Sequence, residues 1–127
     1  MEPATILIVD DQPTVLSTVV AILGRAGFKV LSAGSAERAL RICREQSLIE
    51  VALIDVLMPG MDGLEIRKTL VTEFPEIHVL LMSGYSREGI SSGESGVVAA
   101  EFIQKPFPPR ILVDRVRVAM EGLPRPS

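Results

Sequence analysis

The chain has a single cysteine, a single histidine and no tryptophan among its 127 residues. One cysteine can form neither a disulfide framework nor a cysteine-based metal cluster, and such sparse use is typical of proteins in the reducing cytoplasm. Cys43 follows Ala36, Ala39 and Leu40 at helical spacing. We therefore expect Cys43 to be a core residue and not a reactive thiol.

Clustered positive charge is also lacking. The chain has 13 basic and 16 acidic residues, a net charge of −3, and no run of Lys or Arg that would attract nucleic acid. No apolar run approaches the roughly 18 residues needed to span a bilayer, and the N-terminus lacks the pattern of a secretory signal. We predict a cytoplasmic protein in which this domain contacts neither nucleic acid nor membrane.

Apolar residues are plentiful, at 47% of the chain, which suffices for one core. They gather in short segments that predict strands at Thr5–Val9, Phe28–Ser32, Val51–Ile54, Val79–Met82 and, more weakly, Glu101–Gln104. Consecutive apolar residues indicate strands that are buried on both faces, as in a parallel sheet covered by helices.

Helices are predicted between these strands from apolar periodicity and from end signals. They cover Pro13–Arg25, a stretch that follows Ser35 as N-cap, Gly63–Glu73, and a stretch after Pro108 and Pro109. Gly27, Pro75 and Gly122 supply stops. The alternation predicts an α/β fold, a (βα)5 doubly wound five-stranded parallel sheet, over residues 1–121, with residues 122–127 as a tail or the start of a linker.

The segment Ser86–Gly96 departs from this regularity. A regular (βα)5 pattern needs a fourth helix here, yet the segment SREGISSGESG is rich in Gly and Ser. Each Gly costs a helix roughly 1 kcal/mol relative to Ala. We predict that this helix is short, irregular or mobile, and that its order changes with ligand state.

Polar residues follow the predicted strands. Asp10 and Asp11 end the first strand, Asp55 the third, Ser83 the fourth and Lys105 the fifth. Because the carboxyl ends of parallel strands meet at one edge of the sheet, we expect these five residues to converge.

Three neighbouring carboxylates repel one another, so they call for a divalent cation and the ammonium group of Lys105. An oxygen-only ligand set favours Mg²⁺, with Mn²⁺ as an alternative. The cation, Lys105 and the Ser83 hydroxyl would also suit an incoming phosphoryl group, which makes Asp55 a candidate nucleophile.

Four motifs in this order, ILIVDDQP, LIDVLMPGMDG, LLMSGYS and FIQKPF, resemble the receiver domains of two-component response regulators over about residues 5–121. The resemblance implies the flavodoxin-like strand order 2-1-3-4-5 and a phosphoryl group received by Asp55 from a histidine kinase or phosphotransfer protein. Mg²⁺ would be held by Asp10, Asp11, Asp55 and the backbone carbonyl of Leu57. Ser83 and Lys105 would contact the phosphoryl group, Phe102 would be the aromatic switch, and Lys105-Pro106 would be a cis peptide.

Two positions near this site lack groups that could orient an attacking water. Leu57 lies two residues after Asp55, and Tyr85 lies two residues after Ser83. Neither side chain is an acid or an amide. We therefore expect slow self-dephosphorylation and no other enzymatic turnover.

The expected output surface combines the fourth helix, the last strand and the last helix, and it is also a candidate homodimer surface. Its apolar and basic residues are Ile90, Val97, Val98, Ile111, Arg110, Arg115 and Arg117. The sequence identifies neither the cognate kinase nor the output.

Other functions fit less well. An aspartate-based, Mg²⁺-dependent phosphohydrolase resembles this fold but has its nucleophile in a D-x-D pattern after the first strand, where this chain has adjacent acids. A flavin or nucleotide site would need amides and hydroxyls where DDQP offers carboxylates. An interaction module that is never phosphorylated would not need the full set of site residues.

Overall fold

The computed structural model describes residues 4–46, 48–58, 61–83, 102–104 and 107–120. Its main sheet has five parallel strands in the order β2-β1-β3-β6-β7. Their bounds are β1 Thr5–Val9, β2 Lys29–Ala33, β3 Ile49–Asp55, β6 His78–Ser83 and β7 Phe102–Gln104. Counted without the two short strands β4 and β5, this is the expected order 2-1-3-4-5, so the flavodoxin-like prediction is confirmed.

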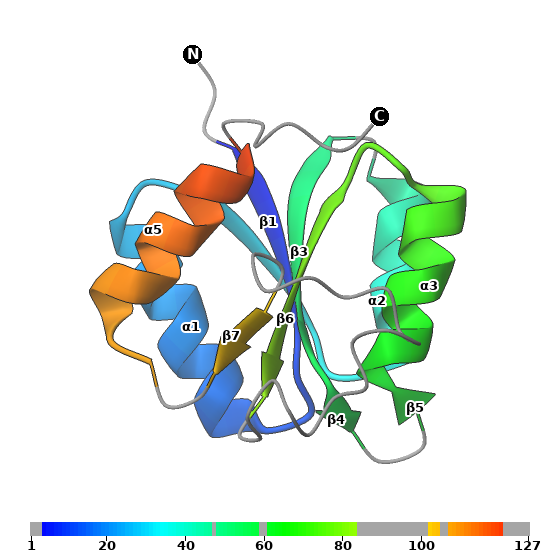
Figure 1. Cartoon of the computed structure of the whole chain (residues 1–127), viewed down its shortest axis with the longest axis horizontal. Coiled ribbons are helices and arrows are strands. Elements are labelled where there is room, and N and C mark those ends of the chain that lie inside the picture. The colour runs from blue at the N-terminus through cyan, green and yellow to red at the C-terminus, as the bar shows by residue number, and fades with distance from the viewer. Residues whose placement is uncertain (1–3, 47, 59–60, 84–101, 105–106, 121–127) are drawn as a thin grey trace.

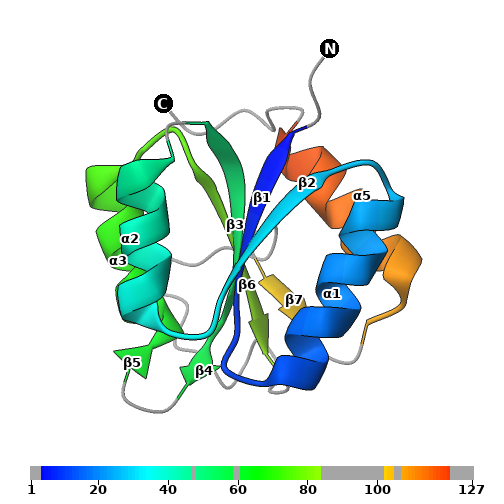
Figure 2. The same cartoon turned by 180° about the vertical axis from the view of Figure 1, so that it is seen from behind.

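Helices cover both faces of the sheet (Figures 1 and 2). On one face lie α1 Pro13–Arg25 and α5 Pro109–Met120, and on the other lie α2 Ala36–Glu45 and α3 Gly63–Glu73. Each layer buries its own apolar cluster against the sheet: Leu7, Ile54, Leu70 and Leu81 belong to the α2 and α3 side, and Ile8, Leu23, Leu53 and Leu112 to the α1 and α5 side. The three central strands are thus buried on both faces, as their continuous apolar segments predicted.

Helix ends follow local signals in the sequence. Helix α1 begins at a proline, which suits the first turn because its missing N–H needs no partner there, and Gly27 adopts a left-handed φ of 99° just after the helix. Ser35 caps α2: its Oγ accepts a hydrogen bond of 3.2 Å from the backbone N–H of Arg38. The predicted bounds of α1 and α3 agree with the structure.

Strand bounds differ in detail. Strand β2 is Lys29–Ala33, one residue later than expected, because the N–H of Phe28 still donates to the carbonyl of Leu23 in α1. Strand β3 starts at Ile49 and includes the exposed Glu50, which interrupted the apolar segment in the sequence. The structure also contains an antiparallel hairpin, β4 Leu57–Met58 with β5 Met61–Asp62, that was not predicted.

Three expectations fall on residues outside the described ranges: the irregular fourth helix at Ser86–Gly96, the Lys105-Pro106 peptide and the tail 122–127. Within the described ranges, no helix combines the length and the apolar character needed to cross a bilayer.

Cys43 is buried in α2 at 3% exposure. Desolvation raises the pKa of its thiol to about 11, although nearby Arg44 opposes the shift. The prediction of a core residue is confirmed.

Candidate functional site

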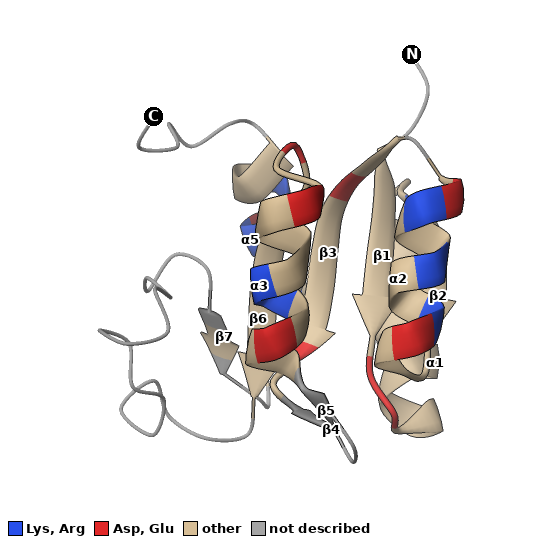
Figure 3. Ribbon diagram, turned by 90° about the vertical axis from the view of Figure 1, so that its right-hand side faces the viewer, with Lys and Arg blue, Asp and Glu red and all other residues tan. Residues whose placement is uncertain are grey.

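Three carboxylates meet at the carboxyl edge of the sheet, as the sequence predicted. Oxygen atoms of Asp10, Asp11 and Asp55 all lie within 4.8 Å of one another. Asp10 is 0% and Asp55 6% exposed, whereas Asp11 is half-buried. Figure 3 shows acidic residues at the ends of β1 and β3. Burial of like charges at such short range is costly unless other groups compensate it.

The backbone around Asp10 fixes its carboxylate. Its N–H donates to the carbonyl of Ala33 at 3.1 Å, which extends the pairing of β1 with β2 beyond the end of the strand. Its Oδ1 accepts a hydrogen bond of 2.9 Å from the N–H of Gln12. This bond fixes the direction of the Asp10 carboxylate at the end of β1.

Asp55 ends the central strand, and the chain after it is tied on two sides. The N–H of Val56 donates to the carbonyl of Met82 at 2.9 Å, and the N–H of Gly63 donates to the carbonyl of Val56 at 2.8 Å. The loop between them contains the β4–β5 hairpin. Asp55 is therefore positioned by neighbouring β6 and by the first residue of α3.

Gly63 lies against the backbone of Asp55, and this close approach was not predicted from the sequence. A Cβ at this position would collide with the backbone carbonyl oxygen of Asp55 and lie 2.7 Å from the Cα of Val56. Glycine thus allows the start of α3 to lie directly against the end of β3. The signal in the sequence was a glycine at the first residue of a predicted helix. Ser, Thr, Asp and Asn are commoner at helix N-termini, and a Gly inside a helix usually has a packing or functional reason.

Ser83 ends β6 and is 1% exposed. It follows Met82, the residue paired with Asp55, and its own partner in the register is Gln104 of β7. The backbone thus brings Ser83 to the same edge of the sheet as Asp55, and places the chain that leads to Lys105 beside it.

Four expected roles fall wholly or partly outside the described residues. Lys105 and Tyr85 are outside them altogether. Leu57 lies in β4 and Phe102 in β7, but the structure describes only their backbone.

The carboxylate cluster fits a small divalent cation. Its three side chains offer only oxygen, the ligand that Mg²⁺ and Mn²⁺ prefer. Ligands on opposite sides of Mg²⁺ lie about 4 Å apart, since each Mg–O bond is about 2.1 Å. Oxygen atoms within 4.8 Å of one another can therefore share an ion after small side-chain rotations.

Comparisons with known proteins agree with this geometry. The family model described as response regulator receiver domain matches residues 6–117. Response regulator GtcR of Aneurinibacillus migulanus is 31% identical over 116 residues, which are 91% of this chain and 47% of that protein. The hydrogenase transcriptional regulatory protein HoxA of Cupriavidus necator is 35% identical over 120 residues, 94% of this chain and 24% of that protein. The chain thus spans about half or less of the length of these curated relatives.

Solved structures show the same fold. A CheY-like response regulator receiver domain protein from Methanospirillum hungatei is 30% identical with a TM-score of 0.82, and the alignment covers 94% of each chain. A receiver domain protein from Clostridium thermocellum is 28% identical with a TM-score of 0.84, covering 93% of this chain and 94% of that one. With its carboxylate cluster, its strand order and the family match over residues 6–117, the chain belongs to the response regulator receiver domains.

Proposed function

We propose that this receiver domain is a switch in which Asp55 accepts a phosphoryl group. The observation that supports this most strongly is the carboxylate cluster: oxygen atoms of Asp10, Asp11 and Asp55 lie within 4.8 Å of one another, and two of the three residues are buried. Such a cluster costs folding free energy in the absence of a compensating cation, so it is better explained by ligand chemistry than by stability.

The donor is a phosphohistidine on a histidine kinase or phosphotransfer protein. A carboxylate oxygen of Asp55 attacks the phosphorus atom, an O–P bond forms, and the N–P bond to the imidazole breaks. The imidazole nitrogen keeps the electron pair and takes up a proton. Asp10, Asp11, Asp55 and the backbone carbonyl of Leu57 would hold Mg²⁺ or Mn²⁺, and a cation there would neutralise charge on the phosphoryl oxygens.

The remaining site residues stabilise and report the new group. The Ser83 hydroxyl donates a hydrogen bond to a phosphoryl oxygen and the Lys105 ammonium pairs with another. The phosphoryl group adds up to about two negative charges beside the carboxylates. Its contacts with Ser83 and Lys105 therefore favour a different arrangement of the chain between these two residues. Phe102 changes rotamer, and the surface of residues 86–96, β7 and α5 regulates a partner, a second copy or an attached output.

Incubation with acetyl phosphate and Mg²⁺, followed by intact-mass measurement, tests the assignment. Wild type is expected to gain one phosphoryl group and Asp55→Ala none. Asp114→Asn, which alters an exposed acid on α5, is the matched control and is expected to react like wild type. Modification of both wild type and Asp55→Ala, or of neither, would refute the role of Asp55.

A further inference from the structure

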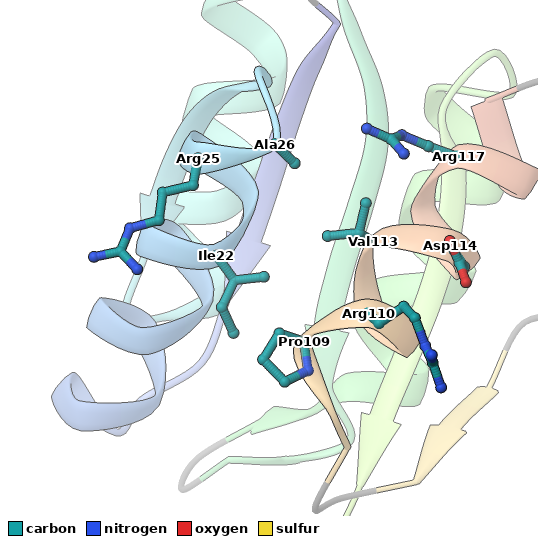
Figure 4. Close-up of a pocket in the computed structure, with 8 residues that line it drawn as sticks. All are labelled: Ile22, Arg25, Ala26, Pro109, Arg110, Val113, Asp114 and Arg117. Atoms are coloured by element: carbon teal, nitrogen blue, oxygen red, sulfur yellow. The ribbon is translucent and has the colours of Figure 1, made fainter.

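A second surface, outside the carboxylate cluster, lies between the two helices that cover one face of the sheet. It has a volume of about 410 Å³, within the roughly 300–1,000 Å³ of protein ligand pockets. We name it the α1–α5 groove. Figure 4 shows its lining, which is Ile22, Arg25, Ala26, Pro109, Arg110, Val113, Asp114 and Arg117.

The groove has an apolar floor and a charged rim. The side chains of Ile22, Pro109 and Val113 lie in the gap between the helices. The Arg117 side chain extends from α5 towards α1, while Arg25 and Arg110 extend outward on opposite sides. An apolar floor beneath polar side chains is the arrangement expected where an amphipathic partner binds.

The rim is basic although the whole chain is acidic. Three arginines and one aspartate line the groove, whereas the formal net charge of the chain is −3. Among the described residues Arg44 forms an ion pair with Glu73, whereas none of the three groove arginines takes part in one. All three arginines are exposed residues, so their side chains can turn towards a bound anion.

Helix stability explains two of these arginines but not the third. Arg25 and Arg117 lie in the last turns of α1 and α5, where a cation is favoured by the helix dipole. Arg110 lies in the first turn of α5, which contains no acidic residue. A cation at this end is unfavourable for the helix, so Arg110 increases the positive potential of the groove at a cost to α5.

We propose that the α1–α5 groove binds an acidic, amphipathic segment of a partner protein. From Pro109 to Arg117 the groove follows α5 for about 12 Å, at 1.5 Å per residue, which suits an elongated segment better than a compact ligand. Apolar side chains of the segment enter between Ile22 and Val113, and its carboxylates pair with the rim arginines. A symmetric contact between two copies would instead bring like-charged rims together.

A titration of isotope-labelled protein followed by NMR tests this proposal. The probe is a short helix-forming peptide of leucines and glutamates, and its control has glutamine at every glutamate. The protein variants are Arg110→Gln/Arg117→Gln and, as a control of equal charge, Arg38→Gln/Arg41→Gln on the exposed side of α2. All four positions are exposed, so the folded spectra of both variants can be compared directly with that of wild type.

The acidic peptide is expected to shift the amide signals of Ile22, Ala26 and Val113, and Arg110→Gln/Arg117→Gln should weaken its binding about tenfold. The α2 control should bind like wild type. The proposal is wrong if the acidic peptide does not bind, if the glutamine peptide binds equally well, or if both double variants lose the same affinity. Groove signals that shift with protein concentration alone would assign this surface to a second copy instead.

Discussion

The carboxylate cluster makes a specific prediction about stability in the absence of metal. Asp10→Asn keeps an oxygen that can accept the hydrogen bond from the N–H of Gln12, and it removes one negative charge from a group of three. Two unit charges 4.8 Å apart repel by about 3 to 4 kcal/mol at an effective dielectric constant of about 20. Because Asp11 is half-buried and water screens it, we expect a smaller net gain of about 1 to 2 kcal/mol in the free energy of unfolding.

Urea unfolding in EDTA at low ionic strength measures this gain. Glu50→Gln is the matched control, since Glu50 is an exposed acid on β3 outside the cluster, and it should change stability little. Adding Mg²⁺ should stabilise wild type by RT ln(1 + [Mg²⁺]/Kd) and Asp10→Asn by less. If Asp10→Asn is less stable than wild type in EDTA, the reasoning about repulsion fails. If Mg²⁺ stabilises both proteins equally, Asp10 is not a ligand.

Four further predictions concern other parts of the chain. Gly63→Ala should cost about 1 to 3 kcal/mol in urea unfolding and slow the reaction with acetyl phosphate, because the new methyl group displaces the backbone of Asp55. A variant as stable and as reactive as wild type would contradict the close approach of α3 to β3. Ser35→Ala should cost about 1 kcal/mol, and Ser17→Ala in the exposed part of α1 much less. Cys43 should react with iodoacetamide at pH 8 only when the protein unfolds, and rapid alkylation of the folded protein would refute this prediction. Because the pKa of its thiol is raised from 9.0 to about 11, the contribution of the buried thiol to stability should decline as pH rises through that interval. Leu57→Asn/Tyr85→Glu should shorten the lifetime of the phosphorylated protein, measured by intact mass after removal of the donor, and an unchanged lifetime would mean that these positions do not limit attack by water.

Most of the fold could be predicted because strong local signals coincide with it. Pro13, Gly27 and Ser35 mark helix ends in the sequence and occupy those ends in the structure. Convergence of Asp10, Asp11 and Asp55 followed from one rule, that carboxyl ends of parallel strands share an edge. That rule needs only the order of strands and not their exact bounds.

The unpredicted features depend on contacts between distant segments. The β4–β5 hairpin consists of two-residue strands, which are too short to show any periodic pattern in the sequence. The role of Gly63 depends on how closely α3 approaches β3, which no local pattern reports. The α1–α5 groove combines residues from the first and the last described helix, which are far apart in the sequence.

The division of the apolar residues into two clusters has a consequence for how the molecule can evolve. The sheet separates the layer of α2 and α3 from the layer of α1 and α5, so side chains of the two helical layers do not share a packing surface. Substitutions in one helical layer should therefore combine additively with those in the other. The surface beside α1 and α5 can diverge towards new partners while the opposite layer, which includes the start of α3 against Asp55, keeps the carboxylate cluster in place.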